Sequence, residues 1–365
     1  MNILCVIDSL RSGGAQRQLV ELALGLKKRG NNVSFLTYHD IPFYNHLLEE
    51  EGILISCIKE SNYLKRFFKI RFFIRRRSYN AIISFLEAPN FICEFAGFPF
   101  RKWKLLVGER SAQPDIYYNP KLILYRWFHF LADYIVANSN ANIRMVRKVS
   151  PLLPKSKCKV IYNAINFNYW KPSINYYPRK DGKIKLIIAA THFYLKNLNG
   201  LIEALSLLNK EDRQKIKVEW YGEGISKPYI DKSFVEALEK IRAFKLGNII
   251  SFYPATPKIT EIMQDSDAVG LFSFYEGFPN VICEAMACEK PVICTNVSDL
   301  PDLLSHDINL LCSPSKPESI KSALQYLINL DNKRLIQIGS VNRKIAKEHF
   351  DKETIVSEYL ELLNN

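Results

Sequence analysis

Short apolar runs of the kind that form buried parallel strands recur along the whole sequence, and helical patterns separate them. The first example is an apolar run at 2–10, the glycine turn "RSGGAQ", a helical pattern over 15–29 and a second strand at 32–38. Parallel strands need long crossovers, usually helices, to connect them. The alternation therefore predicts an α/β fold with parallel sheets wrapped by helices. Further strands of this first half are predicted at "ILISCI", "AIISFL", "KLLVGE", "YIVANS" and "KVIYNA".

The alternation is interrupted once, by a polar, proline-bearing and aperiodic stretch over 166–182. It then starts again with "KIKLIIAA", "KIKVEWYG", "NIISFYP", "AVGLFS", "PVICTN" and "INLLC" as strands. A chain of 365 residues also exceeds what one core usually supports. We predict two tandem Rossmann-like, doubly wound domains, residues 1–170 and 171–350, facing each other across a cleft, since ligands of such sheets bind at the carboxyl ends of the strands.

Composition excludes several classes of protein. Hydrophobic residues make up 48% of the chain, well above the level of disordered proteins. The eight cysteines are scattered without a CxxC pair, which indicates buried thiols in a reducing compartment rather than a zinc site or disulfide framework. The most apolar long segment, 122–137, contains three charged or titratable residues and is not a membrane span. The chain enters a strand at once, without a signal peptide, so we expect a cytoplasmic protein.

The net charge of +13 is confined to the first half: residues 1–172 hold 26 Lys and Arg against 12 Asp and Glu, leaving 24 against 25 in the remainder. The segment 62–77, "NYLKRFFKIRFFIRRR", mixes seven cations with aromatic and aliphatic residues and has no acid. Two interpretations stay open: a helix lying on an anionic membrane surface, or an ordinary helix with its cations in water. No nucleic-acid-binding motif accompanies the charge, so nucleic acid is not an expected partner. The membrane hypothesis assigns lipid contact to Lys65, Arg66, Arg75, Arg76 and Arg77.

Two carboxylates, Glu276 and Glu284, flank a Gly-Phe-Pro turn in "SFYEGFPNVICEAMACEKPVIC". The preceding strand ends near Ser273, so Glu276 falls on a loop at the carboxyl end of the sheet, where ligands bind. The "GFPN" turn presents backbone amides at a helix start, which suits phosphate. Glu284, about two turns into the helix, is placed to bind vicinal hydroxyls such as those of ribose. This arrangement matches a sugar, a diphosphate and a nucleoside.

These motifs resemble those of a known family, the retaining glycosyltransferases of the GT-B fold often called family 4. The resemblance rests on the two glutamates eight positions apart followed by "EAMACEKPVIC", and covers nearly the whole chain. Supporting motifs are "SGGAQ", "YIVANS", "VIYNAIN", "LKNLNGLIEAL", "YGEG" and "DSDAVGLFS". The first half, with "SFLEAPN" and "GERS", looks like bacterial enzymes that extend lipid-linked or surface polysaccharides such as capsule and lipopolysaccharide. The resemblance also implies that a C-terminal helix, 351–365, packs back on the first domain.

The resemblance implies a role for each matching residue. Glu276 and Lys196 would be catalytic, the first at the donor sugar and the second at the leaving diphosphate. Glu284 would hold the ribose, and Gly13 and Gly14 would let the first loop approach the phosphates. The remaining predicted donor-binding residues are Gly277, Phe278, Pro279, Asn280, Val281, Glu223 and His192.

The implied reaction is displacement of a nucleoside diphosphate from a sugar, with retention, by a hydroxyl of a lipid-linked saccharide. UDP is the expected nucleotide, the cytoplasmic face of the plasma membrane the expected location, and no cofactor or metal is expected, because a lysine and a helix dipole supply the positive charge. For the acceptor, the strand ends of the first domain offer Glu87, Glu109 and Arg110, although ion pairs that hold loops are an equal explanation. Asn138 and Ser139 are interpreted as caps of the following helix rather than as acceptor contacts.

The sequence departs from the family pattern at three places. Thr191 and His192 stand where most members have a second phosphate-binding arginine, and a protonated His192 would be a partial substitute. Glu289 stands where glycine is usual, which we interpret as a surface change, and Ala164 replaces another common glycine. Two alternative functions therefore stay open: a sugar-nucleotide epimerase or hydrolase on the same architecture, and a non-catalytic nucleotide-binding relative.

Overall fold

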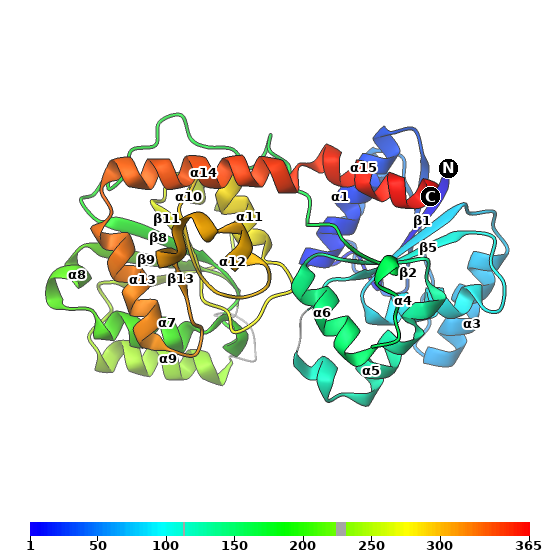
Figure 1. The fold of residues 1–365 in the computed structure, drawn as a ribbon, viewed down its shortest axis with the longest axis horizontal. Coiled ribbons are helices and arrows are strands. Elements are labelled where there is room, and N and C mark those ends of the chain that lie inside the picture. Colours follow the sequence, from blue (N-terminus) through cyan, green and yellow to red (C-terminus); the bar gives the residue numbers. More distant parts are fainter. Residues whose placement is uncertain (112–113, 224–230) are drawn as a thin grey trace. The chain divides into compact units, whose positions relative to one another are not determined.

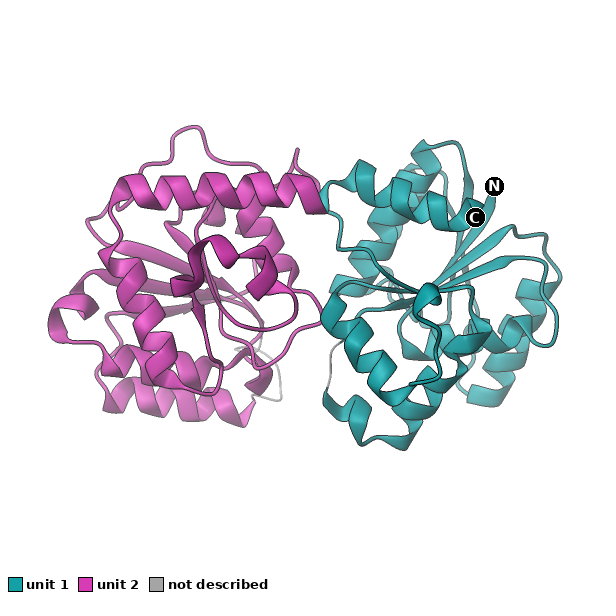
Figure 2. Ribbon diagram, viewed as in Figure 1, with its two compact units in different colours: residues 1–164, 350–365 teal, residues 165–349 magenta. Residues whose placement is uncertain are grey.

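The computed structural model of the protein describes residues 1–111, 114–223 and 231–365 and divides into two compact units (Figure 2). Unit 1 comprises residues 1–164 and 350–365, and unit 2 comprises residues 165–349. The first boundary therefore falls at Ala164 rather than after residue 170. The last glycine of the "YGEG" motif, Gly224, lies outside the described residues.

Unit 1 is built on a seven-stranded parallel sheet with the strand order β3-β2-β1-β4-β5-β6-β7 (Figure 1). The central strand, β4, is buried on both faces: all five of its residues are buried, as expected for a parallel sheet covered by helices on both sides. The strands are β1 (Asn2–Val6), β2 (Asn32–Thr37), β3 (Leu54–Cys57), β4 (Ala81–Phe85), β5 (Lys104–Glu109), β6 (Tyr134–Ala137) and β7 (Cys158–Val160).

Several helices of unit 1 begin at a capping side chain. Asn62 accepts a hydrogen bond from the Lys65 amide at 3.0 Å at the start of α3, and Ser139 accepts one from the Asn142 amide at 3.1 Å at the start of α6. The predicted capping role of Ser139 is confirmed. The helices are α1 (Gly14–Lys28), α2 (Asn45–Glu50), α3 (Tyr63–Arg75), α4 (Glu87–Gly97), α5 (Pro120–Trp127), α6 (Asn140–Val149) and α15 (Lys352–Asn364), with 3-10 turns at Pro114–Tyr117, Phe128–Leu131 and Lys155–Lys157.

Helix α15, the last of the chain, belongs to the core of unit 1. Figure 1 shows it beside α1, and Val356 and Tyr359 are fully or almost fully buried there. Gly25 of α1 lies directly under Val356, so a larger residue at this position would collide with the valine. An ion pair of 2.6 Å between Lys352 and Glu21 closes the contact. The C-terminal helix thus completes the first unit from the far end of the sequence.

Unit 2 is built on a six-stranded parallel sheet with the order β10-β9-β8-β11-β12-β13. Its strands are β8 (Ile184–Ala189), β9 (Ile216–Tyr221), β10 (Ile250–Tyr253), β11 (Ala268–Leu271), β12 (Val292–Thr295) and β13 (Leu311–Cys312). Its helices are α7 (Leu198–Leu207), α8 (Lys210–Gln214), α9 (Lys232–Ala243), α10 (Ile259–Gln264), α11 (Asn280–Ala287), α12 (Leu300–Leu303), α13 (Pro317–Asn329) and α14 (Asn332–Phe350), with 3-10 turns at Tyr194–Lys196 and Ser305–Leu310.

Both sheets reverse their strand order at one point. In unit 1 the chain runs outward from β1 to β3 and then returns to the other side of β1 with β4; in unit 2 it does the same around β8 and β11. The loops that follow the two central strands diverge at such a reversal and leave a crevice at their carboxyl ends, which is where ligands of open α/β sheets bind. The topology therefore gives each unit one expected binding position.

The polar stretch 166–182, whose composition predicts the linker between the two domains, is part of unit 2. The Tyr176 hydroxyl donates to Asp267 Oδ1 at 2.9 Å, and the Lys290 ammonium lies 3.2 Å from the centre of the Tyr176 ring. Arg179 donates to Asn332 Oδ1 at 2.6 Å. These side chains compensate for the missing secondary structure, so the polar composition of the stretch concealed a packed segment.

Glu289 occupies a left-handed backbone conformation, with φ of 59°, directly after α11 ends. Glycine is favoured at such a position because a side chain there is strained by about 1 kcal/mol or more. The left-handed backbone explains why glycine is usual at this position, and the interpretation of Glu289 as a surface change stays a prediction.

We expect Glu289→Gly to raise the free energy of unfolding of unit 2 by about 1 kcal/mol, because it relieves that strain. The matched control is Glu236→Gly in the exposed interior of α9, where the same change should lower the free energy by about 1 kcal/mol. Denaturant titration measures both. Equal destabilisation by the two variants would contradict the explanation.

Candidate active site

The loops after β8 and β11 meet at the strand-order reversal of unit 2. The Phe274 amide donates to the Leu195 carbonyl at 3.0 Å, which holds the two loops together. This contact places the Lys196 Nζ 2.6 Å from Glu276 Oε1, although the two residues are 80 positions apart. Their side chains are 22% and 14% exposed, so both retain access to a ligand from solvent. The structure thus brings together the two residues predicted to be catalytic.

Helix α11 begins beside this ion pair. The Ser298 hydroxyl donates to the Gly277 carbonyl at 2.6 Å and fixes the turn that leads into the helix. Pro279 is the N-cap residue and α11 runs from Asn280 onward, with no acidic residue in its first turn. The positive end of the helix is therefore not neutralised by a side chain of that turn, which suits an anion such as phosphate. The amides of Phe278, Asn280 and Val281 lie at this end, where the sequence placed them, while Pro279 has no N–H to donate.

Glu284 lies closer to the helix start than the sequence suggested. It is the fifth residue of α11, a little more than one turn from Asn280 rather than two, and it is only 6% exposed. A carboxylate accepts hydrogen bonds, and ribose hydroxyls are donors of the right kind. Ribose binding by Glu284 stays a prediction.

His192 does not serve as a phosphate cation in this structure. Its ring is buried between Trp220, Phe234 and Phe252, with centroid distances of 6.0, 4.6 and 5.7 Å. Burial lowers its pKa, despite a 2.9 Å hydrogen bond between Nδ1 and the Glu223 carbonyl. The residue is therefore neutral at pH 7, and the predicted substitution for the family arginine is wrong. The Glu223 side chain is exposed, and it is the backbone carbonyl of that residue that contacts His192.

In unit 1 the corresponding loop carries Gly13 and Gly14. Gly13 precedes α1 in an extended conformation, and the Gln16 amide folds over the space that a side chain at Gly13 would fill. Gln16 in turn donates to Asp8 Oδ1 at 3.0 Å at the end of β1. The glycine therefore permits a compact loop at the strand-order reversal, and its contact with a diphosphate stays a prediction.

The predicted acceptor residues are engaged within unit 1. Glu109 is 3% exposed and its Oε2 lies 2.9 Å from the Arg126 guanidinium, which also reaches Glu87 at 3.2 Å. Arg110 stacks on the Phe85 ring at 3.9 Å and donates to the Tyr359 hydroxyl of α15. For Glu109 these contacts favour the ion-pair interpretation. Glu87, with its side chain 28% exposed, is the acid of this group that remains best placed for an acceptor.

A buried charge cluster extends from Glu109 into the core, and sequence reasoning missed it. His129 Nε2 lies 2.9 Å from Glu109 Oε1, and His129 Nδ1 lies 2.6 Å from Glu94 Oε1, with all three side chains nearly or fully buried. Arg126 and His129 in the apolar stretch 122–137, and Glu94 inside "FICEFAGF", were the available signals. Polar residues inside apolar runs are either partners of one another or functional.

The cluster shifts the pKa of its members. Burial alone would raise the pKa of Glu109, but the Arg126 charge and the His129 hydrogen bond lower this pKa to about 2. Burial alone would likewise lower the pKa of His129, but the charge of Glu94 and the hydrogen bonds that the imidazolium donates to both carboxylates raise this pKa to about 9. Burial raises the pKa of Glu94. His129 is therefore an imidazolium at neutral pH.

We expect unit 1 to lose stability as the pH rises from 7 to above 9. The folded-state pKa of His129, about 9, lies above the ordinary value of 6.5, so its contribution is complete below pH 6.5 and disappears as the pH rises through 9. The shift corresponds to about 3 kcal/mol. Urea unfolding at pH 6, 7.5 and 9.5 measures it, and His129→Gln should be less stable at pH 7 and nearly independent of pH. Equal slopes for the two proteins would contradict this role.

The cations assigned to membrane contact have different surroundings. The Arg66 guanidinium lies 4.5 Å from the centre of the Tyr38 ring, and Arg75 donates to the Phe100 carbonyl at 3.0 Å. Both arginines therefore make contacts within unit 1. Lys65 is exposed. Arg76 and Arg77 stack on neighbouring phenylalanine rings. Within the described parts of the chain, no helix is both long and apolar enough to cross a bilayer.

Comparisons with known proteins agree with this geometry. Residues 12–169 match the family described as Glycosyltransferase Family 4, and residues 173–341 match the family described as Glycosyl transferases group 1. Over 98% of both chains, the protein is 26% identical to the N-acetylgalactosamine-N,N'-diacetylbacillosaminyl-diphospho-undecaprenol 4-alpha-N-acetylgalactosaminyltransferase of Campylobacter jejuni. A second relative from that organism, GalNAc-alpha-(1->4)-GalNAc-alpha-(1->3)-diNAcBac-PP-undecaprenol alpha-1,4-N-acetyl-D-galactosaminyltransferase, is 24% identical over 100% of this chain and 98% of its own.

The fold also has solved counterparts. The crystal structure of Anabaena HepE in complex with UDP aligns over 100% of both chains with a TM-score of 0.85, at 21% identity. The lipopolysaccharide outer core galactosyltransferase WaaB aligns over 100% of this chain and 99% of its own, with a TM-score of 0.74 at 13% identity. The two family matches follow each other along the chain as its two doubly wound units do. The protein is therefore a glycosyltransferase with the GT-B fold.

Proposed function

We propose that the protein transfers a sugar, with retention of the anomeric configuration, from a UDP-sugar to a hydroxyl of a lipid-linked saccharide at the cytoplasmic face of a membrane. The observation that carries the proposal is the contact between Lys196 and Glu276 at the strand-order reversal of unit 2, beside the start of α11. A cation, a helix N-terminus and a carboxylate in this order match a diphosphate followed by a sugar.

The proposed chemistry follows from where charge develops. The acceptor oxygen forms a bond to the anomeric carbon on the face from which the diphosphate departs, and a leaving phosphate oxygen takes the acceptor proton. Negative charge grows on the departing diphosphate, so the Lys196 ammonium and the α11 amides lower the barrier. Glu276 would bind the donor sugar near the reacting carbon and Glu284 would bind the ribose. These groups supply the charge stabilisation without a metal or cofactor.

The acceptor class is taken from the relatives. Both Campylobacter proteins are named for transfer to saccharides linked to undecaprenol through a diphosphate. The resemblance to them extends over nearly the whole chain, including unit 1, where Glu87 lies at the carboxyl end of β4. UDP is supported by the UDP complex of the structural neighbour HepE.

The test measures nucleoside diphosphate release from UDP-, GDP- and ADP-sugars, with and without a membrane extract that supplies lipid-linked saccharides. We expect release from a UDP-sugar that depends on the extract, and a product whose new linkage keeps the anomeric configuration of the donor. Release without acceptor would instead indicate the hydrolase or epimerase alternative. Absence of release from every donor, with the protein folded, would favour the non-catalytic alternative.

A further inference from the structure

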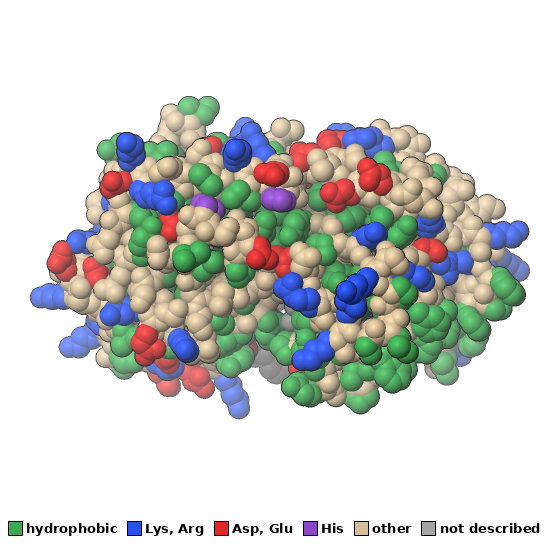
Figure 3. Space-filling model, viewed as in Figure 1, with side chains coloured by type: hydrophobic (Ala, Val, Ile, Leu, Met, Phe, Trp, Pro, Cys, Tyr) green, Lys and Arg blue, Asp and Glu red, His purple; other side chains and the backbone are tan. Residues whose placement is uncertain are grey.

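Helix α3 presents two apolar rows, and the structure covers only one of them. Ile70 and Ile74 are completely buried in the core of unit 1. Leu64, Phe68 and Phe72, spaced four residues apart on another face, are 66%, 63% and 54% exposed. Figure 3 shows hydrophobic side chains gathered on the surface of unit 1 over α3 and α5. The helix therefore packs as an ordinary core helix and still exposes an aromatic face.

The arginines of α3 divide in the same way. Arg71 and Arg75 donate to backbone carbonyls at the end of α4 and just after it, including those of Ala96 and Phe98. Helix C-termini carry unpaired carbonyls and a partial negative charge, which arginines satisfy well. These two cations are therefore structural. The charge that remains available for a partner lies elsewhere on the helix.

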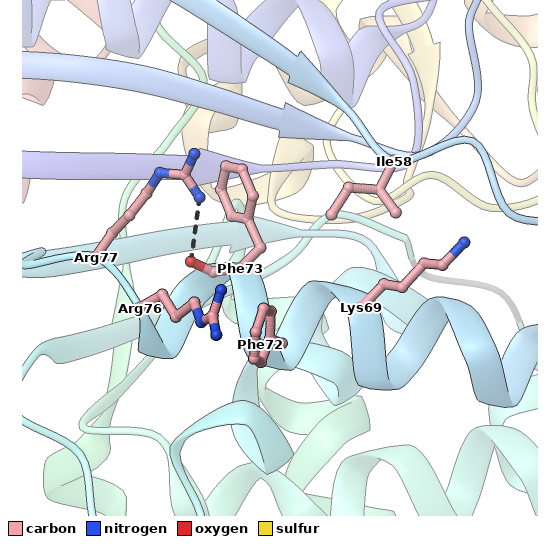
Figure 4. Close-up of a pocket in the computed structure, with 6 residues that line it drawn as sticks. All are labelled: Ile58, Lys69, Phe72, Phe73, Arg76 and Arg77. Carbon is pink, nitrogen blue, oxygen red and sulfur yellow. Dashed lines mark hydrogen bonds between the residues drawn. The ribbon is translucent and has the colours of Figure 1, made fainter.

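Three cations have no carboxylate partner among the residues that the structure describes: Arg76 and Arg77, which directly follow α3, and Lys102, which precedes β5 and lines a hollow with them. The Arg76 guanidinium stacks on the Phe72 ring at 3.7 Å and the Arg77 guanidinium on the Phe73 ring at 3.6 Å (Figure 4). Stacking fixes each guanidinium plane and leaves most of its N–H groups free to donate, an arrangement that suits phosphate oxygens.

Two hollows meet at these arginines. One has a volume of 540 Å³, and its lining residues are Ile58, Lys69, Phe72, Phe73, Arg76 and Arg77 (Figure 4). The other, of 490 Å³, shares Arg76 and Arg77 with the first and adds, among others, Phe100 and Lys102. No Asp or Glu within the described ranges lines either hollow. The first hollow joins aromatic walls to cations, which is the chemistry of an anionic amphiphile.

This position is separate from the predicted acceptor residues of unit 1. Asn80, which lines the second hollow, directly precedes β4, whereas Glu87 follows the same strand. A strand of five residues spans about 17 Å, so the hollows and Glu87 lie at opposite edges of the sheet. A ligand in the hollows would therefore bind unit 1 and leave the carboxyl ends of its strands, where Glu87 lies, unoccupied.

We propose that the C-terminal end of α3 is a binding site for an anionic phospholipid. Arg76, Arg77 and Lys102 donate to its phosphate, while Phe72 and Phe100, 54% and 82% exposed, contact its acyl chains. The site would attach the enzyme to the membrane that carries its lipid-linked acceptor, so its biological role rests on the proposed function. Its physical basis is local: unpaired cations beside exposed aromatic rings bind at the interface of an anionic bilayer.

Vesicle cosedimentation of the full-length protein tests the site. Vesicles of phosphatidylglycerol should bind it and vesicles of phosphatidylcholine should not. The variant R76A/R77A/K102A should lose about a hundredfold in affinity for phosphatidylglycerol, because each of the three removed charges contributes to binding at an anionic membrane surface. The matched control removes three exposed lysines of α14, K333A/K344A/K347A, and should change the affinity by less than about threefold. Equal losses in the two variants would overturn the site.

Two further experiments distinguish a phospholipid ligand from free phosphate. F72S/F100S should weaken binding to phosphatidylglycerol at least about tenfold in 0.5 M salt, where charge is screened and apolar contact remains. Inorganic phosphate should release the protein from vesicles no better than chloride of equal ionic strength. Unchanged binding by F72S/F100S, or release specific to phosphate, would mean that the site takes a free anion and would overturn the lipid assignment. The assay contains no sugar donor, so its failure and the failure of the proposed function are distinguishable.

Discussion

Replacement of Glu276 by alanine should reduce sugar transfer about 10³-fold while leaving the fold intact. The loss is expected because Glu276 lies 2.6 Å from Lys196 beside the start of α11, where a bound donor would place its reacting sugar. A preorganised charged group at such a position contributes about 10² to 10³ in rate. The measurement is the initial rate of nucleoside diphosphate release with the donor and acceptor found for the wild-type protein.

The stability of the Glu276→Ala variant should change by less than about 1 kcal/mol, because both members of the ion pair remain in contact with water. This separates a catalytic loss from unfolding. The control is Glu236→Ala, which removes an exposed acid of α9 in the same unit and should leave the rate unchanged. Undiminished transfer by Glu276→Ala would refute the assigned role.

Replacement of Lys196 by methionine should lower kcat about 10²-fold or more. Methionine keeps the length of the side chain but removes the ammonium that would face the departing diphosphate. Since His192 is buried and neutral, it provides no second cation, so the chain depends on Lys196 more than a family member with the additional arginine would. The effect should fall on kcat as well as on the KM for the donor, because the charge on the diphosphate grows toward the transition state.

Lys232→Met is the matched control for this experiment, since Lys232 is an exposed lysine at the first position of α9. Lys196→Arg should recover part of the lost rate, because it restores the charge with a different shape. An effect of Lys196→Met on KM alone would assign the lysine to ground-state binding and would contradict its proposed part in catalysis.

The architecture of both sheets was predictable because their strands are buried on both faces. Runs such as "AIISFL" and "LIIAA" are almost entirely apolar, and every strand predicted from such a run is present, from β1 to β13. This pattern is a direct consequence of covering a parallel sheet on two sides. The linker was the exception, because Tyr176 and Arg179 pack through polar contacts that no periodicity reveals.

The site of unit 2 was predictable in its residues but not in its geometry. The motif located Glu276 and α11, yet the pairing of Glu276 with Lys196 spans 80 positions and depends on the order β8-β11 in the sheet. The neutral state of His192 was not predictable, because its charge is decided by the aromatic rings around it. Its sequence neighbours, Thr191 and Phe193, do not indicate that environment.

The buried cluster of unit 1 illustrates the same limit. Glu94, Glu109 and His129 come from three separate elements, and each alone resembles an isolated polar residue in an apolar run. Only the fold shows that they satisfy one another. The same holds for the arginines of α3, whose sequence is uniformly basic, whereas the structure separates those that bind α4 from those at the surface.

The position of α15 affects how the protein folds during its synthesis on the ribosome. Residues 1–164 are synthesised before unit 2, but the helix that covers α1 is synthesised after it. N-terminal domains usually fold while the rest of the chain is still being translated. Here the groove around Gly25, which receives Val356, stays uncovered until unit 2 has been synthesised. A nascent chain arrested anywhere in unit 2 would thus expose the apolar residues of α1 that α15 covers in the folded protein.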